Sequence, residues 1–272
     1  MNTLYVTDLD GTLLNSEQKT SDYTNRTINK LINSGMCFSY ATARSYNTAK
    51  KATVGLTANF PVIVYNGVFI KDSQSGKMLL TNFFNREEVL KLIEHLISFD
   101  INPIVYSVID GNEKFSYMKD RINTATKNFI ATRKGDSRDN PVTQIDNLFC
   151  GDVFYITCID EPKKLKPLYE KYKNVFRCLY QTDIYTDEQW FEVMPKNTSK
   201  ANAVKQLAKL LDCDCIIAFG DGLNDIDLFK IADESYAVEN AVPELKSIAT
   251  DIIDSNNRNG VAKWLISHYY SN

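Results

Sequence analysis

Short strand-like and helix-like segments alternate along the first third of the chain. Residues 4–9, 37–41 and 61–65 have the apolar, β-prone composition of strands, and residues 23–32 and 46–54 between them have helical patterns. Strands joined by crossover helices form parallel sheets, since each helix returns the chain to the edge where the previous strand began. The first third therefore predicts a parallel sheet with helices packed on it.

The last third of the chain repeats this pattern. Residues 199–211 predict a helix with apolar positions spaced along one face, and residues 225–231 predict a second helix. Residues 216–220 and 236–238 predict strands. Both ends therefore predict one doubly wound, Rossmann-like α/β core with a parallel sheet.

The middle of the chain differs by carrying longer polar stretches and strands of its own. Its predicted strands and helices are 86–97 (helix), 103–109, 153–159, 162–172 (helix) and 175–180. Residues 133–140, which include a glycine, two aspartates and two arginines, predict a surface loop. We therefore expect a discontinuous core of residues 1–83 and 190–272, with residues 84–189 inserted as a second α/β domain.

Composition excludes several functional classes for these 272 residues. The net charge of −3 and the absence of long lysine or arginine runs argue against nucleic-acid binding. Apolar stretches are only strand-sized, and two aspartates stand where a signal peptide would need its apolar segment, so we expect a soluble cytoplasmic protein that contacts no membrane. Six cysteines without a Cys-x-x-Cys pair indicate free thiols, and two histidines are too few for a zinc site.

Polar residues follow four of the predicted core strands. In doubly wound sheets ligands bind beyond the carboxyl ends of the strands, so these residues are the first candidates for a site. In chain order they are Asp8 and Asp10, Thr42 and Arg44, Asn66, and Asp221, Asn224 and Asp225.

The sequence Asp-Leu-Asp-Gly-Thr at residues 8–12 gives the strongest signal. Alternation along a strand would place Asp8 and Asp10 on one face, where both could reach one ligand. With Asp221 and Asp225 they would form a cluster of four carboxylates, which needs a cation, and oxygen ligands favour Mg²⁺ over zinc. The alternatives are an exposed acidic turn at residues 8–12 and a helix N-cap at Asn224 or Asp225.

A carboxylate that attacks a phosphate dianion must overcome repulsion between like charges. Lys200 could offset that charge from the first turn of a helix capped by Thr198 or Ser199, with Lys196 as the competing choice. Thr42 could donate its hydroxyl to a phosphate oxygen. A solvated lysine and a structural threonine are the alternatives for these positions.

Five motifs in this order resemble the haloacid dehalogenase superfamily, in its Cof-type phosphatase branch. They occupy residues 8–14, 41–44, 65–67, 194–200 and 220–225, and residues 237–241 and 259–262 also resemble that branch. The resemblance covers both ends of the chain and implies that the weakly matching middle is an inserted α/β cap, which would choose the substrate. In that middle Tyr106, Asp110, Asn112, Phe115 and Arg133 could line a lid, although aromatic residues usually form core.

The resemblance also implies roles for individual residues. Asp8 would be the nucleophile that forms an aspartyl-phosphate, and Asp10 the general acid and then the base toward water. Because Asp10 must start protonated near neutral pH, its acidic neighbours would help by raising its pKa. Thr42 would bind the phosphoryl group, and Lys200 would compensate its charge. Mg²⁺ would be coordinated by Asp8, by Asp221 and by the backbone carbonyl of Asp10, with Asn224 and Asp225 in support. The residues implied to contact the substrate are Thr42, Arg44, Asn66, Lys200 and Asn224. The chain departs from the family at Ala43, where glycine is usual, and a positive φ there would be strained.

The motifs together predict a Mg²⁺-dependent phosphoric monoester hydrolase. Its substrate would be a small phosphorylated metabolite, such as a sugar phosphate or a phosphorylated cofactor. A phosphomutase or phosphotransferase of the same superfamily uses the same residues and stays an alternative. A phospho-ligand sensor without turnover is a second alternative, whereas a phosphoacceptor receiver domain would be much shorter than this chain.

Overall fold

A computed structural model describes residues 2–182 and 188–270 of the chain. Two compact units are present, which we call the core unit (Met1–Thr81 with Ser199–Asn272) and the inserted unit (Asn82–Thr198). The inserted unit ends later than residue 189, the expected boundary, because the strand β11 (Gln189–Met194) pairs with strands of the inserted unit.

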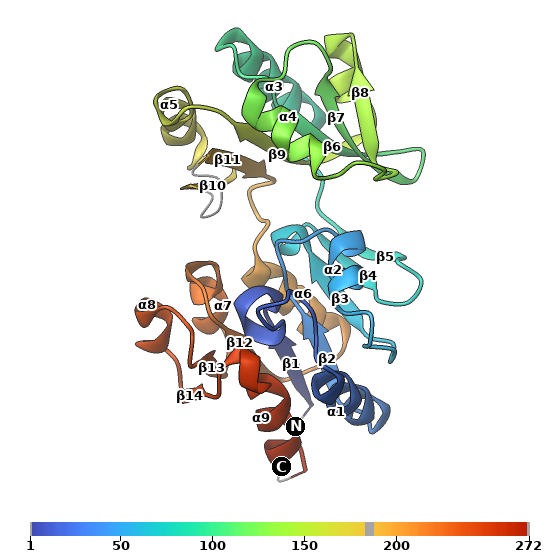
Figure 1. The fold of residues 1–272 in the computed structure, drawn as a ribbon, viewed down its shortest axis with the longest axis vertical. Coiled ribbons are helices and arrows are strands. Elements are labelled where there is room, and N and C mark those ends of the chain that lie inside the picture. The colour runs from blue at the N-terminus through green and yellow to red at the C-terminus, as the bar shows by residue number, and fades with distance from the viewer. Residues whose placement is uncertain (1, 183–187, 271–272) are drawn as a thin grey trace. The chain divides into compact units, whose positions relative to one another are not determined.

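The core unit contains a parallel sheet surrounded by helices (Figure 1). Its elements are β1 (Thr3–Thr7), α1 (Asp22–Asn33), β2 (Cys37–Tyr40), α2 (Tyr46–Ala52), β3 (Pro61–Val64), β4 (Phe69–Asp72), β5 (Met78–Thr81), α6 (Lys200–Leu210), β12 (Cys215–Gly220), α7 (Ile226–Phe229), β13 (Glu234–Val238), α8 (Pro243–Lys246), β14 (Asp251–Ile253) and α9 (Gly260–His268). The strand order is β14-β13-β12-β1-β2, and every neighbouring pair is parallel. The expected fold class is thereby confirmed.

Strand β1 lies between β2 and β12, so segments from opposite ends of the chain are neighbours (Figure 1). The register pairs Thr7 with both Tyr40 and Phe219. The apolar run of β1 has no solvent-facing side, because Leu4 and Val6 are fully buried and the Tyr5 ring packs near Trp264 of α9. This continuous apolar pattern is typical of a parallel strand covered on both faces.

Strand β3 begins a small antiparallel sheet, β3-β4-β5, that the sequence pattern did not predict. An isolated parallel bridge between Ala41 and Ile63 links β3 to the end of β2. The turn from β3 to β4 is tight, with positive φ values of 51° at Tyr65, 54° at Asn66 and 98° at Gly67. This turn makes β4 an antiparallel neighbour of β3.

The inserted unit has a six-stranded sheet in the order β10-β11-β9-β6-β7-β8. Its elements are α3 (Arg86–Ser98), β6 (Ile104–Ile109), β7 (Asn112–Met118), α4 (Thr124–Ala131), β8 (Asp139–Val142), β9 (Asp152–Ile159), α5 (Pro162–Tyr172), β10 (Arg177–Thr182) and β11. Only β7 and β8 pair in parallel. Helices α3 and α5 pack on this sheet through an apolar cluster that includes Leu92, Leu96, Leu165, Ile156 and Phe191.

The expected surface loop at residues 133–140 is only partly correct. Its last residues, Asp139 and Asn140, belong to β8, because their backbone pairs with β7. Arg138 in this segment is 6% exposed, since its guanidinium folds back onto Asp136.

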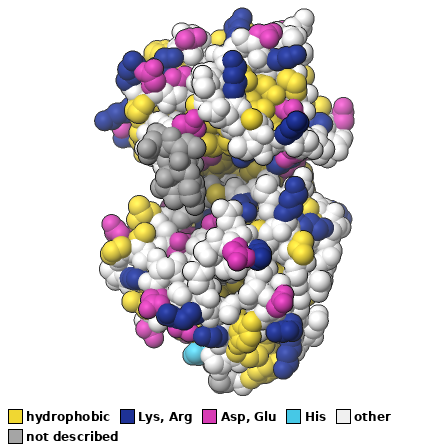
Figure 2. Space-filling view, viewed as in Figure 1, with side chains coloured by type: hydrophobic (Ala, Val, Ile, Leu, Met, Phe, Trp, Pro, Cys, Tyr) yellow, Lys and Arg dark blue, Asp and Glu magenta, His cyan; other side chains and the backbone are white. Residues whose placement is uncertain are grey.

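The face of the molecule shown in Figure 2 carries no single dominant charge. On the face shown in Figure 2, lysine and arginine side chains are interspersed with aspartate and glutamate. Within residues 2–182 and 188–270, no helix is both long and apolar enough to span a bilayer.

Candidate active site

Asp8 is the first residue after β1. Its backbone N–H still donates to the carbonyl of Phe219 in β12 (2.9 Å), and its side chain is almost fully buried. The chain then turns, with φ/ψ of −71°/123° at Asp10 and 74°/−8° at Gly11. These are the angles of a type II turn, which requires glycine at its second central position.

Gly11 is required for a second reason. A Cβ at this position would lie 2.2 Å from Oδ2 of Asp221, much closer than two such atoms can approach. The turn after β1 and the Asp221 carboxylate therefore fit against each other only because residue 11 has no side chain.

Asp8 and Asp10 do not share a face as strand alternation predicted. The strand ends at Thr7, so the alternating geometry does not continue into the turn. Whereas Asp8 is buried, the Asp10 side chain is 51% exposed and forms a bidentate ion pair with Arg44, whose Nε lies 2.8 Å from Oδ2. Arg44 also donates to the side-chain oxygen of Gln18 (3.2 Å).

Lys200 occupies the first turn of α6, and Ser199 is the N-cap, accepting a hydrogen bond from the backbone N–H of Asn202 (3.0 Å). The Lys200 side chain is 3% exposed, and its Nζ donates to Oδ1 of Asp8 (2.5 Å) and Oδ1 of Asp225 (2.8 Å). The competing candidate, Lys196, is exposed. The structure therefore brings Lys200 to the two carboxylates.

The start of α6 is fixed by close contact with the β3–β4 turn. A Cβ on Gly67 would lie 2.3 Å from the backbone oxygen of Ser199. The absence of a side chain at Gly67 lets the turn approach the helix end that carries Lys200.

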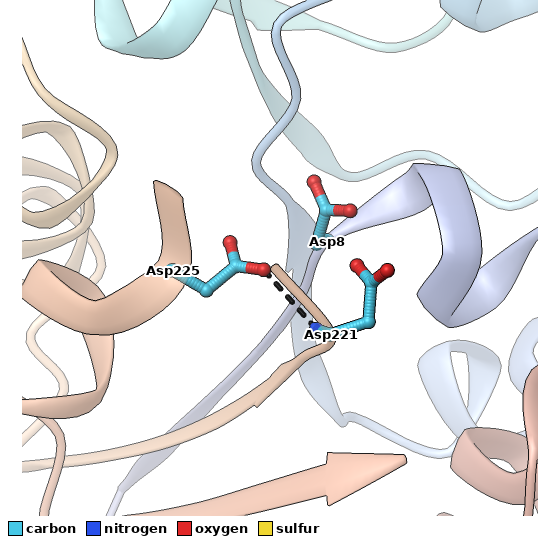
Figure 3. A group of neighbouring side chains, drawn as sticks. All are labelled: Asp8, Asp221 and Asp225. Atoms are coloured by element: carbon cyan, nitrogen blue, oxygen red, sulfur yellow. Dashed lines mark hydrogen bonds between the residues drawn. The ribbon is translucent and has the colours of Figure 1, made fainter. Parts of the chain in front are cut away.

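Asp221 and Asp225 follow β12. Asp225 is fully buried, and its Oδ2 accepts hydrogen bonds from the backbone N–H groups of Asp221 and Gly222 (3.2 Å each). The carboxylate of Asp221 instead accepts a hydrogen bond from the hydroxyl of Thr12 (3.0 Å). The carboxylates of Asp8, which follows β1, and of Asp221 and Asp225, which follow β12, lie close together (Figure 3).

These three carboxylates fit a hard divalent cation. Each offers one oxygen atom, and the three atoms lie within 4.8 Å of one another. Within the part of the chain that the structure describes, this is the only such group of acidic, histidine or cysteine side chains. A donor set made only of carboxylate oxygens favours Mg²⁺ or a similar ion over zinc.

The electrostatics of the cluster show why a cation would be favourable. Burial raises the pKa of Asp8 well above its ordinary value, and Asp225 and Asp221 add to the rise, while Lys200 opposes it. Burial likewise raises the pKa of Asp221 to about 6, with a further contribution from Asp225. Burial disfavours the charged form of Lys200, but Asp225 and Asp8 outweigh this effect and raise its pKa. Lys200 alone does not neutralise the cluster.

Thr42 is fully buried at the bridge between β2 and β3. Its hydroxyl accepts a hydrogen bond from the backbone N–H of Arg44 (3.1 Å), and its carbonyl accepts one from the N–H of Asn66 (2.9 Å). Asn66 itself is 8% exposed. The backbone φ at Ala43 is not positive, so alanine there causes no backbone strain.

Arg44 and Asn224, which were predicted to contact the substrate or the metal, lie outside the buried cluster of carboxylates. Arg44 reaches Asp10, and Asn224 is exposed.

Sequence reasoning gave no role to three residues that contact the site segments. Thr12 binds Asp221, Gln18 binds Arg44, and Asn240 donates to the backbone carbonyl of Gly11 (2.7 Å). Thr12 and Asn240 both lie in stretches that carry the family resemblance, so their motifs were the available signal. Gln18 had no such signal, because nothing near it in the sequence indicates its partner.

Known proteins that are similar to this chain include phosphatases. A model of haloacid dehalogenase-like hydrolases matches residues 5–265. The 5-amino-6-(5-phospho-D-ribitylamino)uracil phosphatase YwtE of Bacillus subtilis is 29% identical, with 95% of each chain covered. A second phosphatase of the same name from that organism, YitU, is 22% identical over 98% of this chain and 97% of its own length. The crystal structure of TM0651 from Thermotoga maritima has a TM-score of 0.78 at 26% identity, covering 98% of this chain and 97% of that one.

Proposed function

This chain belongs to the haloacid dehalogenase-like hydrolases, and we propose that it is a Mg²⁺-dependent phosphatase that hydrolyses a small phosphorylated metabolite through an aspartyl-phosphate at Asp8. The observation that carries the proposal is the buried group formed by Lys200 with Asp8 and Asp225, beside Asp221. A nucleophilic carboxylate, a cation and a candidate metal site together supply what attack on a phosphate dianion needs.

Asp8, Asp221 and Asp225 would hold the Mg²⁺ ion. When bound, the ion would neutralise negative charge on the carboxylates and on the phosphate. Lys200 holds Asp8 in place through Oδ1 and contributes a second positive charge at the same point. The backbone N–H groups of Asp221 and Gly222 fix the orientation of Asp225.

The reaction proceeds in two displacements. A carboxylate oxygen of Asp8 attacks phosphorus, the ester P–O bond breaks, and the leaving alkoxide takes a proton from Asp10. Asp10 then removes a proton from water, which attacks the phosphorus and breaks the bond to Asp8. The products are an alcohol and inorganic phosphate, and both aspartates return to their starting states.

Asp10 must leave its Arg44 partner to take part in proton transfer. The Asp10 side chain is 51% exposed and the Arg44 side chain 20% exposed, so opening this bidentate pair costs more than the roughly 0–1 kcal/mol of a fully exposed pair. A substrate phosphate that takes over the Arg44 guanidinium would offset that cost. Thr42 and Asn66, next to Arg44 along the hydrogen-bonded turn, are the proposed contacts to the phosphoryl group and substrate.

We propose a phosphorylated polyol or sugar as the first substrate class to test. The support is the relative YwtE, whose name specifies a phosphoribityl compound, at 29% identity. Transfer to a second hydroxyl, as in a phosphomutase, uses the same residues and stays the second candidate.

A phosphate-release screen tests the proposal. Some tens of phosphorylated metabolites, with ribityl and sugar phosphates included, would be assayed with Mg²⁺ and with EDTA, for the wild type and Asp8→Asn. We expect release only with the metal and essentially none from the variant, whose folding is checked by circular dichroism. Turnover in EDTA or by Asp8→Asn would contradict the mechanism, and a bisphosphate product without free phosphate would indicate a mutase.

A further inference from the structure

Two sequence motifs near the C-terminal end have no part in the chemistry above. They are residues 237–241 and 259–262, and each contains an asparagine, Asn240 and Asn259. In the structure the side chains of both asparagines bind the segment that follows the nucleophile. Both motifs therefore contact the segment that follows Asp8.

Asn240 comes two residues after β13 and is bonded at both ends of its amide. Its Nδ2 donates to the backbone carbonyl of Gly11 (2.7 Å), and its Oδ1 accepts from the backbone N–H of Asn256 (3.0 Å). The side chain of Asn256 in turn donates to the carbonyl of Leu14 (2.9 Å). Asn240 and Asn256, which we call the asparagine clip, thus hold both ends of the turn after Asp10.

Two further asparagines bind the chain beyond this turn. Oδ1 of Asn257 accepts from the backbone N–H of Ser16 (2.9 Å), and Oδ1 of Asn259 accepts from the hydroxyl of Ser21 (2.6 Å). These contacts are similar hydrogen bonds to a neighbouring stretch, but they do not touch residues 10–14. They therefore provide a natural comparison for the clip.

The carbonyl held by Asn240 belongs to the peptide between Gly11 and Thr12. Rotation of this peptide would move Asp10 on one side and the Thr12 hydroxyl, which binds Asp221, on the other. Glycine resists such rotation least of all residues, because its allowed φ and ψ ranges are widest. A fixed partner for the Gly11 carbonyl therefore limits the position of Asp10, whose carboxylate is half exposed.

We infer that Asn240 is a positioning residue for Asp10, holding the turn so that the carboxyl group can deliver its proton to the leaving oxygen. The inference rests on the proposed phosphatase reaction, because it requires Asp10 to act as an acid. Misplacement of a catalytic group by about 1 Å can cost on the order of 100-fold in rate.

The leaving group separates positioning from mere structural support. An alkyl phosphate has a poor leaving group that needs the proton of Asp10, whereas p-nitrophenyl phosphate releases a stable anion that does not. A variant with a displaced Asp10 therefore has a lower kcat/KM on the alkyl ester and a nearly normal kcat/KM on the aryl ester. The comparison uses kcat/KM because kcat also contains the second displacement, in which Asp10 acts as the base for both esters. General loosening of the site would impair both equally.

The experiment compares Asn240→Ala and Asn240→Asp with the control Asn257→Ala. Aspartate keeps an acceptor for the Asn256 N–H but faces the Gly11 carbonyl with an oxygen, so it should act like alanine. We expect kcat/KM on glycerol phosphate to fall about 10-fold or more in both variants and kcat/KM on p-nitrophenyl phosphate to fall about 2-fold or less. Asn257→Ala should match the wild type on both esters.

Hydrogen exchange gives a readout that does not depend on activity. The N–H of Leu14, which donates to the Leu9 carbonyl (2.8 Å) across the turn, should exchange faster in Asn240→Ala but not in Asn257→Ala. Equal losses of kcat/KM on the two esters, or unchanged exchange at Leu14, would overturn the inference. If the wild type hydrolysed neither ester, the proposed function would fail, and exchange at Leu14 would still decide whether Asn240 holds the turn.

Discussion

The core unit and the inserted unit each contain a buried cation, but the two cations have different partners. Arg138 of the inserted unit pairs closely with Asp136, two residues earlier in the same segment, and more distantly with Glu113 of β7 (4.0 Å). Lys200 of the core unit pairs with Asp8 and Asp225, which lie 192 and 25 residues away along the chain. A local pair stabilises one turn, whereas Lys200 joins three segments at the carboxyl ends of parallel strands, where α/β proteins bind their ligands.

Glycines in the left-handed region show the same contrast. Gly11 and Gly111 have nearly equal φ values, 74° and 77°. A Cβ on Gly111 would meet nothing within 4 Å, whereas a Cβ on Gly11 would collide with Asp221. Equal backbone conformations therefore have different consequences, because only one of them faces charged groups at the end of a parallel sheet.

Substitution of the two buried cations should give the largest difference between the units. Lys200→Met leaves Asp8 and Asp225 buried without their partner, so we expect a loss of about 3–5 kcal/mol in the unfolding free energy of the metal-free protein. Turnover should fall by about 100-fold or more, because the charge that offsets the phosphate is gone. Urea unfolding and phosphate-release kinetics measure the two effects.

Arg138→Met is the matched variant in the inserted unit. It should destabilise the protein but leave kcat within about 2-fold, because Arg138 has no place in the proposed chemistry. A comparable fall in kcat for Arg138→Met would contradict the assignment of a structural role to Arg138 and a catalytic role to Lys200.

Alanine at the two glycines tests the second contrast. Gly111→Ala should cost only the strain of a left-handed residue, about 1 kcal/mol, and leave activity unchanged. Gly11→Ala adds the collision with Asp221, so we expect at least about 10-fold weaker activation by Mg²⁺ in addition to the strain. Titration of activity with Mg²⁺ measures the difference, and equal activation of both variants would contradict the role given to Gly11.

The last prediction concerns pH. The folded protein raises the pKa of Asp221 to about 6, and burial raises that of Glu192 in the inserted unit to about 7, partly opposed by a hydrogen bond from Tyr155. Folding favours the protonated form of each group. As the pH rises from the ordinary pKa of a group to its pKa in the folded protein, that group therefore lowers the free energy of unfolding. Asp221→Asn and Glu192→Gln should therefore gain stability over the wild type across those intervals.

Mg²⁺ distinguishes the two groups. The ion should remove the stability gain of Asp221→Asn, since it would compensate the charge in the wild type, but should leave the gain of Glu192→Gln unchanged. Thermal unfolding between pH 4 and about 8, with and without Mg²⁺, measures both. A Mg²⁺-sensitive gain for Glu192→Gln would show that the ion acts on both units.

The sequence located the core better than the inserted unit for a physical reason. Parallel strands such as β1 and β12 are covered on both faces, so they appear as continuous apolar runs followed directly by Asp8 and Asp221. Strands β4, β5, β7, β8, β11 and β14 escaped prediction. The mixed exposure of β5, β7 and β8 leaves a weaker apolar pattern, whereas β4 is largely buried and depends on a turn and a partner strand that local sequence does not specify.

The placement of site residues could be predicted only in part. Residues that directly follow a strand, such as Asp8 and Asp221, are placed by the sheet itself, and the structure brings them together. The partner of a long side chain is not determined in this way, and Arg44 reaches Asp10 rather than open space for a substrate. Asp10 was misplaced relative to Asp8 because the strand was assumed to continue through a turn that Gly11 makes possible.

The central position of β1 affects how the chain folds during its synthesis on the ribosome. Strand β1 acquires one of its two neighbours, β12, only after α6 has been synthesised. Until then one edge of β1, which contains Leu4 and Val6, stays unpaired in the nascent chain, and unpaired apolar strand edges favour aggregation and chaperone binding. Asp8 is therefore synthesised long before Asp221 and Asp225, and the three carboxylates can come together only in a late step of folding.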